Sequence, residues 1–252
     1  MIDLHNHILC GLDDGPETME ESIAMCRIAY ADGIRSIVAT PHTLNGVYRN
    51  NRTDILARVV ELTERVSESS LCRPDDQLNT LPGADIHLDT EIPGLLMQDT
   101  LMTLGDGKRF LLIEFPSQGI PFGAEQILFQ LMAMRVYPII THPERNLEIM
   151  RKPGRYSDMI RGGCLGQVTA MSLLGGFGPE TRRFSEELVA RRLVHFIATD
   201  AHSTNGRAPV LSGAVRAASK IVGREEADRM VRDYPAAILE GRRPELAKPL
   251  PF

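Results

Sequence analysis

The chain has 252 residues, enough for one large domain or two small ones, and 43% of them are hydrophobic and 24% charged. This composition is typical of a globular protein and excludes a disordered or fibrous chain. The net charge of -5 and the isoelectric point near 5.8 argue against binding to nucleic acid or to an anionic membrane surface. Any anion must therefore bind in a local basic pocket.

The cysteines and the N-terminus both point to the cytoplasm. No basic region followed by an apolar stretch and a cleavage site begins the chain, and no apolar run is long enough to span a bilayer. The four cysteines lie far apart and form no Cys-x2-Cys pair, so we expect reduced thiols rather than a zinc knuckle or disulfide framework: Cys10, Cys26, Cys72 and Cys164. We expect a cytoplasmic protein without membrane insertion.

The first part of the chain alternates between expected strands and helices. A first strand leads into His5, and a helix follows Thr18, whose spacing from Glu21 is that of a capping box. The helix ends near Gly33, and residues 36–39 form a short apolar strand. The helical spacing is carried by Met19, Ile23, Cys26 and Tyr30.

The same alternation continues along the chain. A second helix follows Thr53, on the spacing of Ile55, Val59, Leu62 and Val66. Strands are expected at residues 81–86, 110–115, 137–141, 165–170 and 194–199, although Cys164 and Gly166 weaken the prediction at 165–170. Helices are expected near residues 123–135, 153–162, 179–192, 208–222 and 224–233, with Pro235 and the Arg242-Arg243-Pro244 tail ending the pattern.

This order of elements predicts an α/β fold. Strands that alternate with helices at such spacing run parallel, with the helices as crossover connections. No Ser/Pro/Gly-rich linker divides the chain, so we expect a single domain over residues 1–252 rather than two doubly wound domains. The expected architecture is one closed or nearly closed barrel, covered by the C-terminal helices.

Six of the seven histidines lie in or just after an expected strand. Residues two apart in an extended chain point to the same face, so His5 and His7 can converge on one ion. A pair of surface or barrel-mouth histidines is the alternative. Asp13-Asp14-Gly15 follows in a loop that can fold back onto the same ion, although an ordinary turn before the helix would have the same sequence.

Later strand ends carry more side chains of the same kind. His42 follows Pro41 at a strand end, and Asp85 lies within another expected strand. Glu114 interrupts an apolar run, and burying an uncompensated carboxylate is costly, so it must be protonated or paired with a cation. A partner arginine is the structural alternative. His142 ends a strand, and Asp200-x-His202 repeats the spacing of His5 and His7.

Together these segments predict a multinuclear metal site at the carboxyl ends of the strands. Nitrogen and carboxylate donors without thiolates suit manganese, zinc or iron, and their number implies two or three ions. Such a site suits phosphate ester hydrolysis, in which Arg145 and Arg207 can grip phosphate oxygens unless they are solvated surface residues. A cysteine nucleophile is not expected, because the chain has no Cys-x5-Arg signature. His87 is less persuasive as a site residue, and we interpret His195 as structural.

The motifs resemble those of a known superfamily. In chain order they are similar, over residues 1 to about 207, to the polymerase and histidinol phosphatase superfamily: His5-Asn6-His7, Asp14-Gly15, Thr40-Pro41-His42, Gly83-Ala84-Asp85-Ile86, Leu112-Ile113-Glu114-Phe115, Thr141-His142-Pro143-Glu144-Arg145 and Thr199-Asp200-Ala201-His202. A narrower resemblance links the chain to the bacterial manganese-dependent tyrosine-protein phosphatases of capsule and exopolysaccharide clusters. It is carried by Asp13-Asp14-Gly15-Pro16, Glu20-Glu21-Ser22, the His-x-Glu-Arg segment and the compact length.

This resemblance implies a distorted, TIM-like (β/α)7 barrel with up to three metal ions, Mn(II) first, and a hydroxide nucleophile rather than a phosphoenzyme. Arg145 and Arg207 would hold the phosphate. Asp85 stands where the family usually has glutamate, so a carboxylate shorter by one methylene must reach its ion. The implied metal ligands are His5, His7, Asp14, His42, Asp85, Glu114, His142, Asp200 and His202.

The leading hypothesis is a cytoplasmic, metal-dependent protein-tyrosine phosphatase. The resemblance implies as its substrate a phosphotyrosine-containing protein, the tail of a bacterial tyrosine kinase that controls polysaccharide export. Metal-bound hydroxide would attack phosphorus in line, and His42 or Asp200 would assist the departing phenolate. The alternatives are a small-molecule phosphatase, such as one acting on histidinol phosphate, and a catalytically silent metal-binding module.

Overall fold

Two parallel sheets form the centre of the protein in the computed structural model, which describes residues 1–69, 71–73 and 75–252. The smaller sheet has the order β1-β2-β4, and the larger has the order β3-β5-β6-β7-β8-β9. Every pairing of strands within them is parallel, so the predicted α/β fold with parallel strands is confirmed. The strands are β1 (Ile2–Asn6), β2 (Ser36–Ala39), β3 (His42–Thr43), β4 (Asn79–Pro82), β5 (Asp85–His87), β6 (Phe110–Glu114), β7 (Tyr137–Thr141), β8 (Leu165–Thr169) and β9 (Phe196–Ala198).

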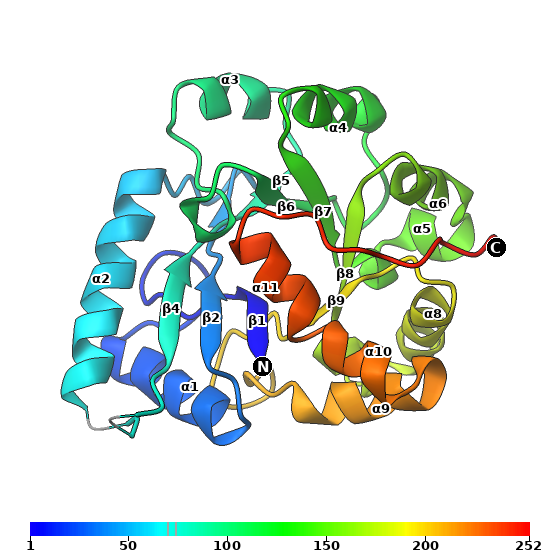
Figure 1. The fold of residues 1–252 in the computed structure, drawn as a ribbon. Coiled ribbons are helices and arrows are strands. Elements are labelled where there is room, and N and C mark those ends of the chain that lie inside the picture. Colours follow the sequence, from blue (N-terminus) through cyan, green and yellow to red (C-terminus); the bar gives the residue numbers. More distant parts are fainter. Residues whose placement is uncertain (70, 74) are drawn as a thin grey trace.

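The helices surround these strands (Figure 1). They are α1 (Met19–Ala31), α2 (Arg52–Glu68), α3 (Ile92–Met97), α4 (Ala124–Ala133), α5 (Leu147–Arg151), α6 (Gly154–Arg161), α7 (Ala170–Leu173), α8 (Pro179–Ala190), α9 (Ser212–Val222), α10 (Arg224–Arg229) and α11 (Asp233–Leu239), with single turns η1 (Leu104–Asp106) and η2 (Pro143–Arg145). The capping box predicted for α1 is present, with Thr18 accepting from the Glu21 backbone N–H. Within the described ranges, no helix combines the length and apolar character needed to cross a membrane.

The strand expected at residues 81–86 is two strands instead. β4 belongs to the smaller sheet and β5 to the larger, and Gly83 lies between them. A Cβ atom on Gly83 would lie 2.7 Å from a methyl group of Val38 and 2.9 Å from one of Thr40, so only glycine lets the chain cross here. The sequence pattern also missed β3, because two residues are too few to show a strand period.

The C-terminal boundaries differ from the predicted ones as well. α9 begins at Ser212 rather than at 208. A residue that precedes a proline, here Pro209, disfavours the helical conformation. Asp32 also accepts hydrogen bonds from the N–H groups of Leu211 and Ser212 at the start of the helix. α10 ends at Arg229. The prediction that Pro235 ends the pattern is wrong, because Pro235 lies in the first turn of α11, where a proline costs no hydrogen bond.

The two sheets meet at the carboxyl end of β1. Asn6 forms a parallel bridge with Ala201, the His7 N–H donates to the carbonyl of Ala201 (2.9 Å), and the Asp200 N–H donates to that of His5 (2.8 Å). The Asn6 carbonyl in turn accepts from the Thr40 N–H at 2.8 Å. These contacts place the His5-Asn6-His7 segment beside the segments that follow β2 and β9.

Substitution of Gly166 by alanine is expected to destabilise the protein by about 1–3 kcal/mol, because the core around β8 has no room for a methyl group. A Cβ atom on Gly166 would clash with the Tyr156 hydroxyl and lie 2.6 Å from the Leu193 carbonyl oxygen, which accepts a hydrogen bond from that hydroxyl. Urea unfolding measures the change. Gly94→Ala is the control, since it fills open space in α3 and should leave stability equal or higher; equal stability of Gly166→Ala would contradict the prediction.

Candidate metal centre

All nine side chains predicted to bind metal lie together where the carboxyl ends of the strands meet. Eight of them fall into three groups, in each of which one donor atom per residue lies within 4.8 Å of the others. The groups are His7, Asp14, His42 and His202; His5, His7 and Asp200; and His42, Asp85 and Glu114. The ninth, His142, has its Nε2 atom 3.5 Å from Glu114 Oε1. Neighbouring groups share His7 or His42 and therefore form one cluster.

The centre of this cluster is the pair of histidines at the end of β1. His5 Nε2 and His7 Nε2 are 3.0 Å apart, and Asp200 Oδ1 lies 3.5 Å from the first and 3.3 Å from the second. Two nitrogen atoms bound tetrahedrally to one ion, at about 2.0–2.1 Å, would be roughly 3.3–3.4 Å apart. The three atoms are thus spaced like donors to a common cation.

Two further pairs face each other without forming a hydrogen bond. His42 Nδ1 lies 3.3 Å from Asp85 Oδ2, and His202 Nε2 lies 3.4 Å from Asp14 Oδ1. His42 Nδ1, Asp85 Oδ2 and His202 Nε2 are buried, and none has a hydrogen-bond partner among the described residues. Such atoms are costly to bury alone, and a cation between them would satisfy both members of each pair. The residues present therefore fit divalent metal ions.

Asp85 reaches the cluster even though it is shorter than the glutamate usual in the resembling family. Its side chain is fully buried, and its Oδ2 atom lies 3.6 Å from His5 Nε2 as well as 3.3 Å from His42 Nδ1. Asp85 is the first residue of β5, two residues after Gly83. Its shorter side chain therefore still lies among the other proposed donors.

The charges of the cluster favour a bound cation. Burial raises the pKa of Asp200, but the nearby His5, His7, Arg145 and Arg207 hold it well below its usual range. Burial also opposes the charge of His7, yet Asp13 and Asp200 raise its pKa to about 10, so these carboxylates favour a positive charge at the ring, from a proton or from a metal ion in its place. Burial and the neighbouring Arg145 lower the pKa of His142 well below its ordinary value, so this imidazole is neutral, as a metal ligand must be.

Both predicted phosphate-binding arginines converge on Asp200. Arg145 Nη1 and Arg207 Nη2 each lie 2.6 Å from Asp200 Oδ2, while Oδ1 of the same carboxylate faces the two histidines of β1. The Arg145 guanidinium also lies 5.0 Å from the centre of the Phe177 ring. Arg207 Nε is buried and has no hydrogen-bond partner in the described part of the chain.

Two of the donors have a strained backbone. His142 and Asp200 follow β7 and β9 with φ angles of 31° and 51°, in the left-handed region that non-glycine residues seldom adopt. Such strain persists where the surrounding structure enforces it, and it is concentrated at functional sites. The strain thus coincides with two of the proposed metal ligands.

The sequence of this centre is that of a known family. Residues 1–240 match the family described as capsular polysaccharide synthesis, CpsB/CapC. The chain belongs to the CpsB/CapC family. It is 40% identical over 207 residues to the tyrosine-protein phosphatase YwqE of Bacillus subtilis (strain 168), covering 82% of this chain and 79% of YwqE. Over 245 residues it is 28% identical to the tyrosine-protein phosphatase CpsB of Streptococcus agalactiae serotype III, covering 95% and 98% of the two chains.

Solved structures agree with this family membership. The fold matches a chain from the crystal structures of YwqE from Bacillus subtilis and CpsB from Streptococcus pneumoniae, described as unique metal-dependent tyrosine phosphatases. The TM-score is 0.93 at 36% identity, and the match covers 100% of this chain and 99% of that one. A dihydropyrimidinase from Brevibacillus agri, 10% identical with a TM-score of 0.53, shares only the fold and covers 94% and 70% of the two chains.

Several residues behind the donor side chains were not assigned a supporting role in the sequence analysis. Asp13 Oδ2 lies 2.6 Å from His7 Nδ1, and Gln167 Oε1 lies 3.0 Å from His5 Nδ1. Buried Glu144 accepts hydrogen bonds from the Thr169 N–H (3.0 Å) and the Ser172 hydroxyl (2.7 Å), which ties η2 to the end of β8. Asp13 had one signal, its place beside Asp14, whereas Gln167 on β8 had none.

The remaining two histidines have different surroundings. His87 Nδ1 lies 3.7 Å from Glu114 Oε2, so His87 borders the centre, although its donors belong to none of the three groups. His195 is buried, and its Nδ1 atom accepts from the Gly166 N–H at 3.1 Å. Burial lowers the pKa of His195 to about 3, so it is neutral in the core, as the structural interpretation expects.

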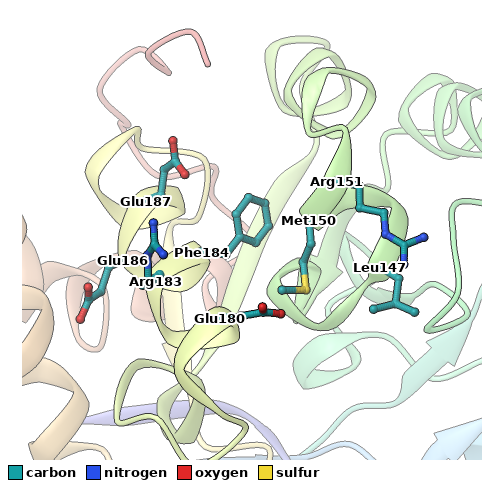
Figure 2. A pocket seen from close by; sticks show the side chains of 8 residues that line it. All are labelled: Leu147, Met150, Arg151, Glu180, Arg183, Phe184, Glu186 and Glu187. Carbon is teal, nitrogen blue, oxygen red and sulfur yellow. The ribbon is translucent and has the colours of Figure 1, made fainter.

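A small cavity borders the metal centre, and one of its donor side chains is half exposed. A cavity of about 50 Å3 is lined by Glu114, His142 and Arg145, among others, and the side chain of Asp14 is 54% exposed. A cavity of about 550 Å3 opens instead between α5 and α8, where Met150 and Phe184 face each other (Figure 2). No predicted site residue lines that larger cavity.

Proposed function

We propose that this chain is a metal-dependent protein-tyrosine phosphatase. One observation carries the proposal: Asp200 faces the histidine pair of β1 with one oxygen and two arginines with the other. A phosphoryl group at this place would contact metal ions and guanidinium groups together. The tyrosine-protein phosphatases among its relatives support the choice of substrate.

The proposed metal ligands are the nine residues implied by the family resemblance: His5, His7, Asp14, His42, Asp85, Glu114, His142, Asp200 and His202. We propose two or three Mn(II) ions, with iron and zinc as the alternatives that the same donors accept. When bound, such ions lower the pKa of a water molecule and offset charge on phosphoryl oxygens.

The protein side chains would position the phosphate ester and its leaving group. Arg145 and Arg207, which both reach Asp200, would donate to the non-bridging oxygens of the phosphoryl group and hold it beside the metal ligands. Asp200 stays ionised between these arginines and His42 is a proposed metal ligand, so neither is suited to donate a proton to the phenolate oxygen. Phenolate is a good leaving group and needs little such help.

The proposal extends to architecture and context. Residues 1–252 would form a single phosphoesterase domain, a distorted (β/α)7 barrel in which the contact between Asn6 and Ala201 joins the two sheets. The substrate would be a phosphotyrosine-containing protein in the cytoplasm, the tail of a tyrosine kinase of capsule or exopolysaccharide synthesis. The description of the CpsB/CapC family supports this context.

Manganese-loaded protein is expected to hydrolyse a phosphotyrosyl peptide at least tenfold better, in kcat/KM, than histidinol phosphate, because the 54% exposed side chain of Asp14 places one edge of the centre at the protein surface, where a macromolecular substrate can reach it. Steady-state kinetics with the two substrates side by side measure this ratio. Preference for histidinol phosphate would move the protein to the small-molecule alternative. Bound metal without turnover of either substrate would support a silent metal-binding module.

A further inference from the structure

Asp13 lies behind the metal centre, in the same turn as Asp14. Its side chain is fully buried, and its Oδ2 atom lies 2.6 Å from His7 Nδ1 and accepts from the His42 backbone N–H at 2.9 Å. Its Oδ1 atom accepts from the Gly15 N–H at 3.0 Å. One carboxylate therefore contacts two of the proposed ligand residues and the turn that carries a third.

The turn itself is built to hold Asp13 in this place. A Cβ atom on Gly15 would clash with the carbonyl oxygen of His7, so glycine lets the turn pack directly against the end of β1. The packing directs Asp13 inward, while the neighbouring Asp14 faces His42 and His202 with its side chain half exposed. Two consecutive carboxylates thus approach the centre from different sides.

The contact with Asp13 decides which nitrogen of His7 is available. An ionised carboxylate only accepts hydrogen bonds, so the shared proton belongs to His7 Nδ1. Nε2, the atom 3.0 Å from His5 Nε2 and 3.3 Å from Asp200 Oδ1, is then the nitrogen whose proton a metal ion would displace. His5 is held differently, because its Nδ1 atom faces the neutral amide of Gln167.

We propose that Asp13 is a positioning residue of the metal centre, which holds His7 with Nε2 toward the ions and fixes His42 beside it. A carboxylate behind a coordinating imidazole orients the ring and strengthens its nitrogen as a donor. The inference rests on the metal site of the proposed function. It adds that Asp13 contributes to metal affinity without touching a metal ion or substrate.

Asp13→Asn tests this role with little change of shape. Asp13 accepts three N–H groups with two oxygens, from His7, His42 and Gly15. Asparagine has one oxygen, so its NH2 group must face either the Gly15 N–H or the pair from His7 and His42. Asp32→Asn is the matched control, since Asp32 also accepts two backbone N–H groups, from Leu211 and Ser212, outside the three donor groups.

The Mn(II) dissociation constant of chelator-treated protein is the main measurement, by calorimetry or by the electron paramagnetic resonance signal of free Mn(II). Asp13→Asn is expected to bind Mn(II) about 10- to 100-fold more weakly than the wild type, and Asp32→Asn equally well. The activity of Asp13→Asn should require correspondingly more Mn(II) while its KM for peptide stays near that of the wild type. Equal Mn(II) affinity of Asp13→Asn and wild type, with or without a lower melting temperature, would overturn the proposal.

A second measurement needs no variant. In long-range 1H–15N spectra of zinc-loaded wild-type protein, His7 is expected to carry its proton on Nδ1, and a proton on Nε2 would overturn the proposal even if Asp13→Asn does not fold. The proposed function is tested separately, because wild-type protein that binds no Mn(II), or binds it without hydrolysing phosphotyrosyl peptide, would contradict that function before any variant is compared.

Discussion

Removal of metal with a chelator is expected to lower phosphotyrosyl peptide hydrolysis by roughly a thousandfold or more, equivalent to about 4 kcal/mol of transition-state stabilisation. The described site offers no cysteine nucleophile in its place, because its donors are histidines and carboxylates. Added Mn(II) should restore the rate. The measurement is kcat/KM before chelation, after it, and during titration with Mn(II).

Two controls make this result specific. Circular dichroism of the stripped protein shows whether the fold survives. This control is needed because removal of the metal leaves the nine donor side chains close together without a cation to balance their charges. Calcium, which prefers oxygen ligands to imidazole, should restore little activity. Full activity in protein whose metal content has been verified as negligible would contradict the proposed mechanism.

Substitution of Arg145 or Arg207 by lysine is expected to lower kcat/KM by roughly 100- to 1000-fold. Each guanidinium group is partly exposed and lies 2.6 Å from Asp200 Oδ2. The ammonium group of lysine cannot replace it, because it lacks the planar pair of N–H donors that binds two phosphate oxygens at once. Because the lost contact strengthens as charge develops in the transition state, kcat should fall more than KM rises. The two single variants and the double variant are compared by steady-state kinetics.

Arg151→Lys provides the matched control. Arg151 ends α5, the helix that follows Arg145, and it lines the cavity between α5 and α8 rather than the metal centre. Its activity should remain close to that of the wild type. Mn(II) affinity of the Arg145 and Arg207 variants should be retained, so a loss of metal from them would show that these arginines act on the centre and not on phosphate.

The sequence by itself predicted which side chains gather at the site, and it determined most of the scaffold that brings them together. Residues two apart in an extended chain point to the same face, so the spacing of His5 and His7 predicts that their side chains lie together. The apolar runs before Glu114, His142 and Asp200 predicted strands that the structure contains. Parallel strands follow from their alternation with helices, so donors after successive strands had to gather at one end. Residue spacing within each element and the order of the elements along the chain are sufficient for these predictions.

Only the tertiary structure decided how the donors are paired and held. Asp13 and Gln167 contact the Nδ1 atoms of His7 and His5. Local periodicity does not predict these contacts, since Gln167 is in sequence an ordinary buried residue of β8. The crossing at Gly83 depends on its packing against Val38 and Thr40 from another strand. The convergence of Arg145 and Arg207 on Asp200 likewise joins segments after different strands. Sequence spacing specifies which face a side chain takes within one element, whereas long-range packing specifies which atoms of different elements meet.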